Sequence, residues 1–99
     1  MTDWHLYIIR TASGTLYTGV TTDVGRRFAE HQASGPRCAR SLRGKGPLQL
    51  VFSQPVGGRS RALSLEWHVK RWPRRHKDEL IRGERSLITP SASGQVKTP

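Results

Sequence analysis

Five side chains of this sequence have types and spacings that can do chemistry. Arg27 and His31 are four residues apart in a helix-type stretch, so a permanent cation and a titratable ring lie on one helix face. An arginine can bind phosphate through two parallel hydrogen bonds. Tyr7 and Tyr17 lie in two stretches of strand-type sequence, and Glu66 offers a carboxylate that can hold a divalent metal ion.

The two tyrosines belong to a predicted β-hairpin. Leu6–Ile9 and Leu16–Val20 are rich in β-branched and aromatic residues, and residues 11–15 between them have the composition of a turn. Residues directly opposite one another in a hairpin share a face. A register that sets Tyr7 opposite Tyr17 would place the two phenols side by side. Taken alone, such a pair more often packs than reacts.

The same register would give Gly19 a role in binding. It sets His5 opposite Gly19, on the face that carries the phenols. Because glycine has no side chain, it would leave a gap where the backbone of a ligand can come close. We therefore expect Gly19 to line a binding site.

A helix is predicted over residues 23–32, after a cluster of good N-cap residues. Its apolar stripe consists of Val24 and Phe28, four residues apart. Arg27 and His31 each lie three residues from a member of this stripe. They should therefore border the buried face rather than point to open water. The other charged side chains of the helix read as ordinary surface charges: Arg26 and Glu30.

A basic segment follows this helix. Residues 33–36 end the helix, and residues 37–42 are expected to form a short helical turn. The glycine-containing loop after the turn lacks the spacing of a P-loop and does not lie between a strand and a helix in that order. We interpret the segment as a basic connection that contacts a phosphate backbone. Its cations are Arg40, Arg43 and Lys45.

The rest of the chain predicts one strand and two helices. Leu48–Phe52 is strand-type sequence, which Pro55 and the glycines after it should end. A helix is expected from Arg59 to Trp72. Pro73 stops that helix and starts another, which ends at about Arg82. We expect one domain over residues 1–84 and a flexible tail over residues 85–99.

Glu66 lies at the edge of the apolar stripe of its helix. The stripe consists of Ala62, Leu65, Val69 and Trp72, and an acid beside it is unexpected. Two interpretations stand. The carboxylate is either paired with an arginine at the edge of the core or a ligand of a metal ion.

Composition favours a polyanionic partner. The 99 residues contain 17 Lys and Arg against 7 Asp and Glu, which gives a formal net charge of +10. Nucleic acid is a better match than a membrane surface, because no basic helix has a clean, bulky apolar face. The residues expected to contact nucleic acid are Gly19, Arg26, Arg40, Arg43 and Lys45.

Other classes of protein are excluded by what the sequence lacks. The single cysteine, Cys38, cannot form an internal disulfide or a cysteine-cluster zinc site. No apolar run is long enough to cross a membrane, and the first residues do not resemble a signal peptide. We therefore expect a cytoplasmic protein.

The ordered set of motifs resembles the GIY-YIG nuclease superfamily, and its short layout resembles the standalone bacterial YhbQ-like group. The first signature stands as His5-Leu6-Tyr7 and the second as Tyr17-Thr18-Gly19. The helix with Arg27 and His31 follows, and the Glu66 helix comes later. The resemblance covers about residues 4–82.

The resemblance implies an α+β fold, with a small three-stranded antiparallel sheet flanked by helices. It also implies a nuclease that hydrolyses phosphodiester bonds of DNA with one divalent ion, Mg²⁺ or Mn²⁺, and a role in DNA repair or recombination. RNA is not excluded, and specificity would come from DNA shape or from a protein partner. By position, Tyr7 and Tyr17 are the signature tyrosines, Arg27 binds the scissile phosphate, His31 assists the tyrosines and Glu66 holds the metal.

Two departures from the family pattern support an alternative. His5 stands where the family usually has glycine, and the chain contains no asparagine, although many members carry one after the glutamate helix. The alternative is a nucleic-acid-binding module that keeps the scaffold with weak catalysis.

The tyrosine chemistry also sets a condition. A free tyrosine has a pKa of about 10, so a tyrosine that takes a proton from water near neutral pH needs a lowered pKa. We expect neighbouring cations and His31 to supply part of that change for Tyr7.

Overall fold

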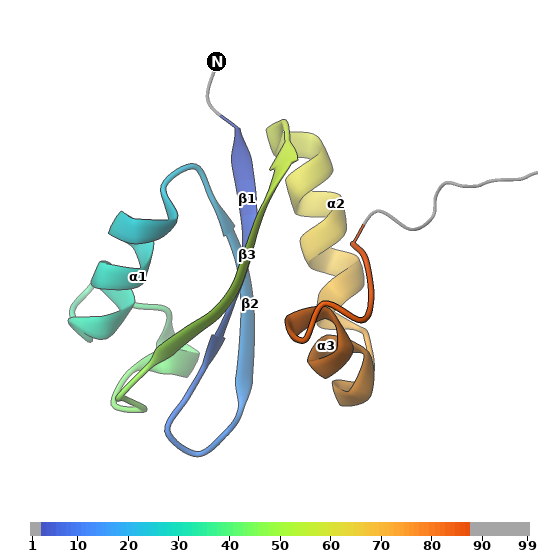
Figure 1. The fold of residues 1–99 in the computed structure, drawn as a ribbon. Coiled ribbons are helices and arrows are strands. Elements are labelled where there is room, and N and C mark those ends of the chain that lie inside the picture. The colour runs from blue at the N-terminus through green and yellow to red at the C-terminus, as the bar shows by residue number, and fades with distance from the viewer. Residues whose placement is uncertain (1–2, 88–99) are drawn as a thin grey trace, which may run out of the picture.

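Three antiparallel strands form the centre of the fold. The computed structural model describes residues 3–87. Its strands are β1 (Trp4–Arg10), β2 (Leu16–Thr21) and β3 (Gln49–Gly57), and their order in the sheet is β2-β1-β3. The first strand of the chain is therefore the central one, with a neighbour on each side (Figure 1).

Helices cover both faces of this sheet. Helix α1 (Val24–Gln32) lies on one side, and α2 (Arg59–Lys70) and α3 (Arg74–Ile81) lie on the other (Figure 1). A single 3₁₀ turn, η1 (Arg40–Leu42), stands between α1 and β3. The α+β architecture and the order of the elements are as predicted.

The central strand supplies side chains to two separate cores. Successive side chains of a strand point to opposite faces, so Leu6 and Ile8 enter one core and Tyr7 and Ile9 enter the other. The Leu6 core lies on the side of α2 and α3 and includes Val69 among its buried residues. The Tyr7 core lies on the side of α1. A candidate functional residue is thus part of the packed interior.

The third strand is longer than predicted. We expected it to end near Phe52, with Pro55 as a breaker, but Pro55 lies inside β3, opposite His5 of β1. A proline cannot donate a hydrogen bond to a neighbouring strand, and β3 is an edge strand, where one side needs no partner. The strand ends at Gly57, whose φ of +97° turns the chain.

The end of the described chain packs on the domain. Pro73 is the N-cap of α3 rather than its first helical residue. Beyond α3, Leu87 is only 2% exposed and Arg85 pairs with Glu79 at 2.9 Å. Packed structure thus continues at least to Leu87, past the expected boundary at residue 84. The remainder of the predicted tail, residues 88–99, lies outside the described residues.

Candidate active site

The register of the hairpin differs from the predicted one by two residues. Tyr7 lies opposite Gly19, and Tyr17 lies opposite Ile9. His5 lies opposite Thr21 instead of Gly19. A shift of two residues keeps every side chain on its original face, so the two tyrosines still share a face of the sheet.

The turn between the strands explains this register. All five residues 11–15 belong to the loop, because Thr11 and Thr15 close it with two hydrogen bonds. The N–H of Thr11 donates to the carbonyl oxygen of Thr15 at 2.9 Å. The N–H of Thr15 donates to the side-chain oxygen of Thr11 at 3.1 Å. Gly14, at a φ of +94°, supplies the backbone conformation that the turn needs.

The space over Gly19 is filled by Tyr7. A Cβ atom on Gly19 would lie 2.5 Å from the Tyr7 hydroxyl oxygen and 2.6 Å from the ring carbon that carries it. The gap that we expected to receive the backbone of a ligand therefore holds a phenol. Gly19 therefore contributes to the site indirectly. Because it has no side chain, the Tyr7 hydroxyl can lie against β2.

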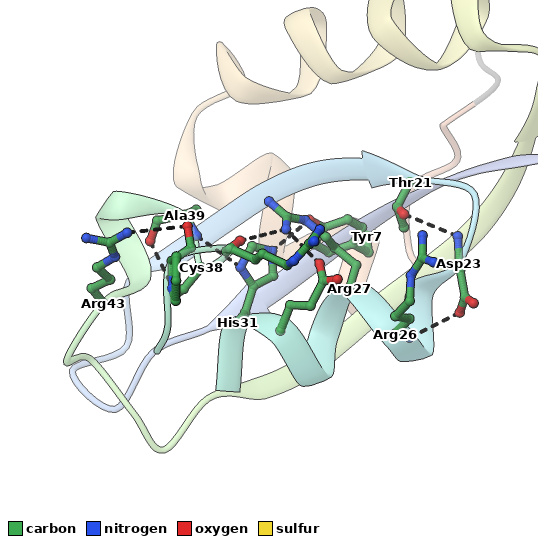
Figure 2. Close-up of polar contacts among 12 residues, drawn as sticks. Tyr7, Thr21, Asp23, Arg26, Arg27, His31, Cys38, Ala39 and Arg43 are labelled. Carbon is green, nitrogen blue, oxygen red and sulfur yellow. Dashed lines mark hydrogen bonds and ion pairs between the residues drawn. The ribbon is translucent and has the colours of Figure 1, made fainter. Parts of the chain in front are cut away.

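His31 of α1 holds the Tyr7 hydroxyl. Its Nε2 and the Tyr7 Oη atom are 3.0 Å apart, and its Nδ1 accepts a hydrogen bond from the Ala39 backbone N–H at 3.2 Å (Figure 2). His31 is fully buried. Burial lowers the pKa of His31 below the ordinary value for histidine, and the charge of Arg27 lowers it further. The ring is therefore neutral near neutral pH.

Tyr17 completes an aromatic group with these two residues. Its ring centre lies 6.3 Å from that of Tyr7 and 5.5 Å from that of His31. Tyr17 is half-buried, whereas Tyr7 is 2% exposed. The phenols are thus neighbours on a diagonal of the sheet, and Tyr17 is the one that faces solvent.

The pKa of Tyr7 moves in the direction opposite to the one we expected. Burial raises it well above its ordinary value, and Tyr17 raises it further. Arg27 opposes this shift by its charge and by a hydrogen bond, but burial outweighs it. Tyr7 is therefore a protonated phenol at neutral pH in the protein alone.

Arg27 is held beside the aromatic group by two oxygen atoms. Its Nη1 donates to the carbonyl oxygen of Arg37 at 2.7 Å and to the Glu30 carboxylate at 2.9 Å (Figure 2). Its side chain is 31% exposed, so part of the guanidinium reaches solvent. Glu30 is thus a partner of a site residue, not the ordinary surface charge that we expected. The hydrogen bond from Arg27 lowers the pKa of Glu30.

Glu66 stands apart from this group. It lies on α2, on the face of the sheet opposite α1 (Figure 1), and its ion-pair partner is Lys70 at 3.3 Å. Within residues 3–87, no hydrogen bond or ion pair joins Glu66 to the tyrosines, Arg27 or His31, and no cluster of three His, Cys, Asp or Glu side chains is placed to hold a metal ion. The structure brings four of the five predicted residues together.

Backbone groups of residues 37–39 are the part of the site that sequence reasoning missed. The Arg37 carbonyl holds Arg27, and the Ala39 N–H holds His31. Cys38 between them is buried in the Tyr7 core. Every residue has a backbone carbonyl and every residue except proline has an N–H, so no residue type could have signalled their role. The segment is the start of the basic connection that we assigned to phosphate contact.

The predicted nucleic-acid-binding cations are exposed on the α1 side of the fold. Arg26 lies in the first turn of α1, which Asp23 caps, and its side chain is exposed. The others lie on η1 and the loop after it, where each is exposed: Arg40, Arg43 and Lys45. Residues 31–65 contain six Lys and Arg and no acid, so this stretch carries an unbalanced positive charge.

Trp67 on α2 is a large apolar side chain that is 54% exposed. The guanidinium of Arg71 lies 4.1 Å from the centre of its ring. Such stacking holds the indole in place at the surface.

The helices of residues 3–87 are all too short or too polar to span a membrane.

Comparisons with known proteins agree with this architecture. Residues 3–89 match the model of the GIY-YIG catalytic domain. A UPF0213 protein of Enterobacter sp. (strain 638) is 54% identical over 84 residues, which cover 85% of this chain and 80% of that protein. A UPF0213 protein of Sodalis glossinidius is 59% identical over 78 residues, covering 79% of this chain and 71% of that protein.

A solved structure is also similar. The solution NMR structure of a UPF0213 protein from Bacillus halodurans has a TM-score of 0.53 and 30% sequence identity to this chain. The match covers 93% of this chain and 99% of that one.

Proposed function

The chain belongs to the GIY-YIG catalytic domain family, and on that premise we propose that it is a divalent-metal-dependent nuclease that hydrolyses phosphodiester bonds of DNA. The observation that carries the proposal is the buried hydrogen bond between Tyr7 and His31, with Tyr17 and Arg27 beside it. These side chains come from three elements, β1, β2 and α1. A buried polar cluster that converges on one hydroxyl group is typical of a reactive site.

Arg27 is the phosphate-binding residue of this proposal. Hydrolysis brings a water oxygen to phosphorus while the bond to the leaving oxygen breaks, and negative charge develops on the phosphoryl oxygens. A guanidinium stabilises that charge through paired hydrogen bonds. Nη1 of Arg27 is already bound by Glu30 and the Arg37 carbonyl, which fixes the direction of the side chain.

The tyrosines act on the attacking water and the phosphate. Tyr7 is the more strongly positioned, since its oxygen is held by His31 and lies against Gly19. We assign it the role of holding and activating the water. Tyr17 is more exposed and is assigned to position the phosphate.

Glu66 is the residue that would hold the metal ion. Its side chain is 20% exposed, and its carboxylate already has one cation beside it, the Lys70 ammonium at 3.3 Å. Magnesium commonly keeps several waters and uses one or two carboxylates together with substrate phosphate, so Glu66 would be enough as the protein ligand where the substrate phosphate also reaches α2. When bound, the ion would supply charge stabilisation to the phosphate and the leaving oxygen.

The exposed cations supply binding. Arg26, Arg40, Arg43 and Lys45 are exposed on the α1 side of the fold and suit contact with a phosphate backbone. Contacts of this kind do not read base sequence, so specificity would come from the shape of the nucleic acid or from a protein partner. A place in DNA repair or recombination is consistent with such a nuclease.

A cleavage assay tests the proposal. Labelled single-stranded, duplex, flap and branched DNA, and RNA, are incubated with the protein and Mg²⁺, Mn²⁺ or EDTA. We expect metal-dependent cleavage that is lost in Arg27→Ala and Glu66→Ala proteins whose thermal unfolding is unchanged. An unchanged single-turnover rate in Tyr7→Phe would refute the role of Tyr7.

A second candidate is a binding module with weak catalysis. The ion pair between Glu66 and Lys70 favours this candidate, because it gives the Glu66 carboxylate a structural partner that is not one of the residues around Tyr7. This candidate predicts salt-sensitive binding of nucleic acid, with no cleavage of any substrate at any metal concentration.

A further inference from the structure

We infer that the backbone N–H of Ala39 locks His31 in one tautomer, so that His31 donates a hydrogen bond to the Tyr7 oxygen and cannot take the Tyr7 proton. The inference deepens the proposed nuclease function and rests on it for its catalytic meaning. It makes His31 a positioning residue that acts through Tyr7. It also assigns a function to the backbone N–H of Ala39, which could not be recognised from the residue type.

The direction of one hydrogen bond decides the tautomer. A backbone N–H can only donate, and the Ala39 nitrogen lies 3.2 Å from His31 Nδ1. Nδ1 must therefore carry a lone pair and no hydrogen. A neutral imidazole has one N–H, so the hydrogen of His31 is on Nε2.

The charged form of His31 does not fit this geometry. An imidazolium carries hydrogens on both nitrogens, and its Nδ1–H would point at the Ala39 N–H. The ring is also fully buried. Two charged groups near the ring have opposite effects: Arg27 disfavours a positive charge on His31, and Glu30 favours one. The phenols of Tyr7 and Tyr17 are the other titratable groups beside the ring.

The tautomer sets the direction of the bond to Tyr7. His31 Nε2–H donates to the Tyr7 oxygen across 3.0 Å, so the hydroxyl hydrogen of Tyr7 must point away from His31. Tyr7 can release that proton only on the side away from His31, where Tyr17 is a neighbouring hydrogen-bonding group. A hydrogen bond to an anion is stronger than one to a neutral oxygen. His31 therefore stabilises the phenolate form, which can then take a proton from the attacking water.

The segment that supplies the lock is itself well held. Cys38 is 4% exposed within the Tyr7 core, and the Arg37 carbonyl on its other side binds Arg27. Three consecutive residues thus orient the two α1 side chains of the site, one through a carbonyl and one through an N–H. Ala39 has φ −58° and ψ 139°, values that proline also adopts.

Nitrogen NMR of the wild-type protein tests the tautomer without any substrate. In ¹⁵N-labelled protein near neutral pH, we expect His31 Nε2 to show the chemical shift of a protonated ring nitrogen and Nδ1 that of an unprotonated one. An Nδ1–H tautomer, or an imidazolium with both nitrogens protonated, would overturn the inference.

Ala39→Pro tests the source of the lock. Proline suits the φ of this position but has no N–H. We expect the His31 spectrum to move toward the Nδ1–H tautomer, with Ala39→Gly, which keeps the N–H, as the matched control. If folded Ala39→Pro protein keeps the wild-type tautomer, the lock does not come from Ala39. If Ala39→Pro does not fold, the wild-type spectrum still decides the tautomer.

Two isosteres of His31 test the donor role in catalysis. Glutamine can place an NH₂ group near the position of Nε2, whereas asparagine can reach only the position of Nδ1. We expect His31→Gln to keep most of the cleavage rate and His31→Asn to lose about 10- to 100-fold, the range for a lost hydrogen bond to a charged group. Equal losses in both folded variants would overturn the donor role. No cleavage by the wild type would overturn the proposed function alone, and the ¹⁵N shifts would still decide the tautomer.

Discussion

The Tyr7 hydroxyl lies against Gly19 so closely that a Cβ atom on Gly19 would come within 2.5 Å of it. The two residues face each other across the β1–β2 pair. The contact means that the position of the phenol depends on the absence of a side chain in the neighbouring strand. Gly19, the glycine of the second signature motif, thus helps to position Tyr7.

Gly19→Ala should therefore displace Tyr7. The new methyl group would overlap both the hydroxyl oxygen and its ring carbon, and overpacking of this kind costs about 1–3 kcal/mol of stability. We expect the Tyr7–His31 hydrogen bond to break and cleavage to be lost, while circular dichroism stays that of a folded protein. Gly25→Ala is the matched control, because a Cβ atom there meets only the Asp23 carboxylate, at 3.8 Å. Wild-type activity in Gly19→Ala would contradict the tight placement of Tyr7.

Lys70→Ala should lower the concentration of Mg²⁺ that half-saturates the protein. The Lys70 ammonium lies 3.3 Å from the Glu66 carboxylate and competes with any cation that binds there. Titration of cleavage rate with Mg²⁺ measures the effect, and Arg75→Ala removes an equal charge from an exposed position of α3 as a control. An unchanged midpoint in Lys70→Ala, with an unchanged maximal rate, would argue against Glu66 as the metal ligand.

Acid should destabilise the protein through His31. Burial depresses the pKa of His31 in the folded state, so the unfolded chain binds a proton more readily than the folded one. The stability is fully present above the unfolded value of about 6.5 and falls as pH drops through the lowered folded value, by at most about 1.4 kcal/mol per pH unit.

Thermal unfolding between neutral pH and mildly acidic pH measures this dependence. His31→Gln cannot titrate, so its melting temperature should fall less over the same interval. If the melting temperatures of the two proteins fall in parallel as the pH is lowered, protonation of His31 is not the cause of the acid destabilisation.

Charge removal from the basic connection should reduce the salt dependence of binding. Each phosphate contact contributes about −0.9 to the slope of log affinity against log salt concentration on duplex DNA. A protein with Arg40, Arg43 and Lys45 changed to alanine should lose up to about 3 units of slope. Arg82→Ala, on the C-terminal side of α3 and paired with Glu84, serves as the control. A slope that does not change would place the nucleic acid on another surface.

Side-chain spacing was enough to predict that Arg27 and His31 border the buried face of α1, but not which groups hold them there. Arg27 and His31 could be placed at the buried edge of α1 because helical periodicity is regular, and His31 is indeed fully buried. The Ala39 N–H that binds His31 could not be predicted, since it depends on the path of a loop and not on a residue type.

The hairpin register and the length of β3 escaped prediction for different reasons. The shift of two residues leaves the side-chain faces unchanged, so the apolar pattern cannot detect it, and the Thr11–Thr15 bonds decide it instead. Pro55 ends a strand only where its missing N–H would be needed. Whether it is needed depends on which strand becomes the edge, which is a property of the whole sheet.

The strand order β2-β1-β3 has a consequence for how the protein is made. Tyr7, Tyr17, Arg27 and His31 all leave the ribosome within the first 31 residues, yet the central strand that carries Tyr7 lacks one neighbour until β3, which starts at Gln49, has been synthesised. A two-stranded hairpin is marginally stable at best in water. A nascent chain that ends before β3 therefore carries all four side chains but lacks the three-stranded sheet that holds Tyr7 in place.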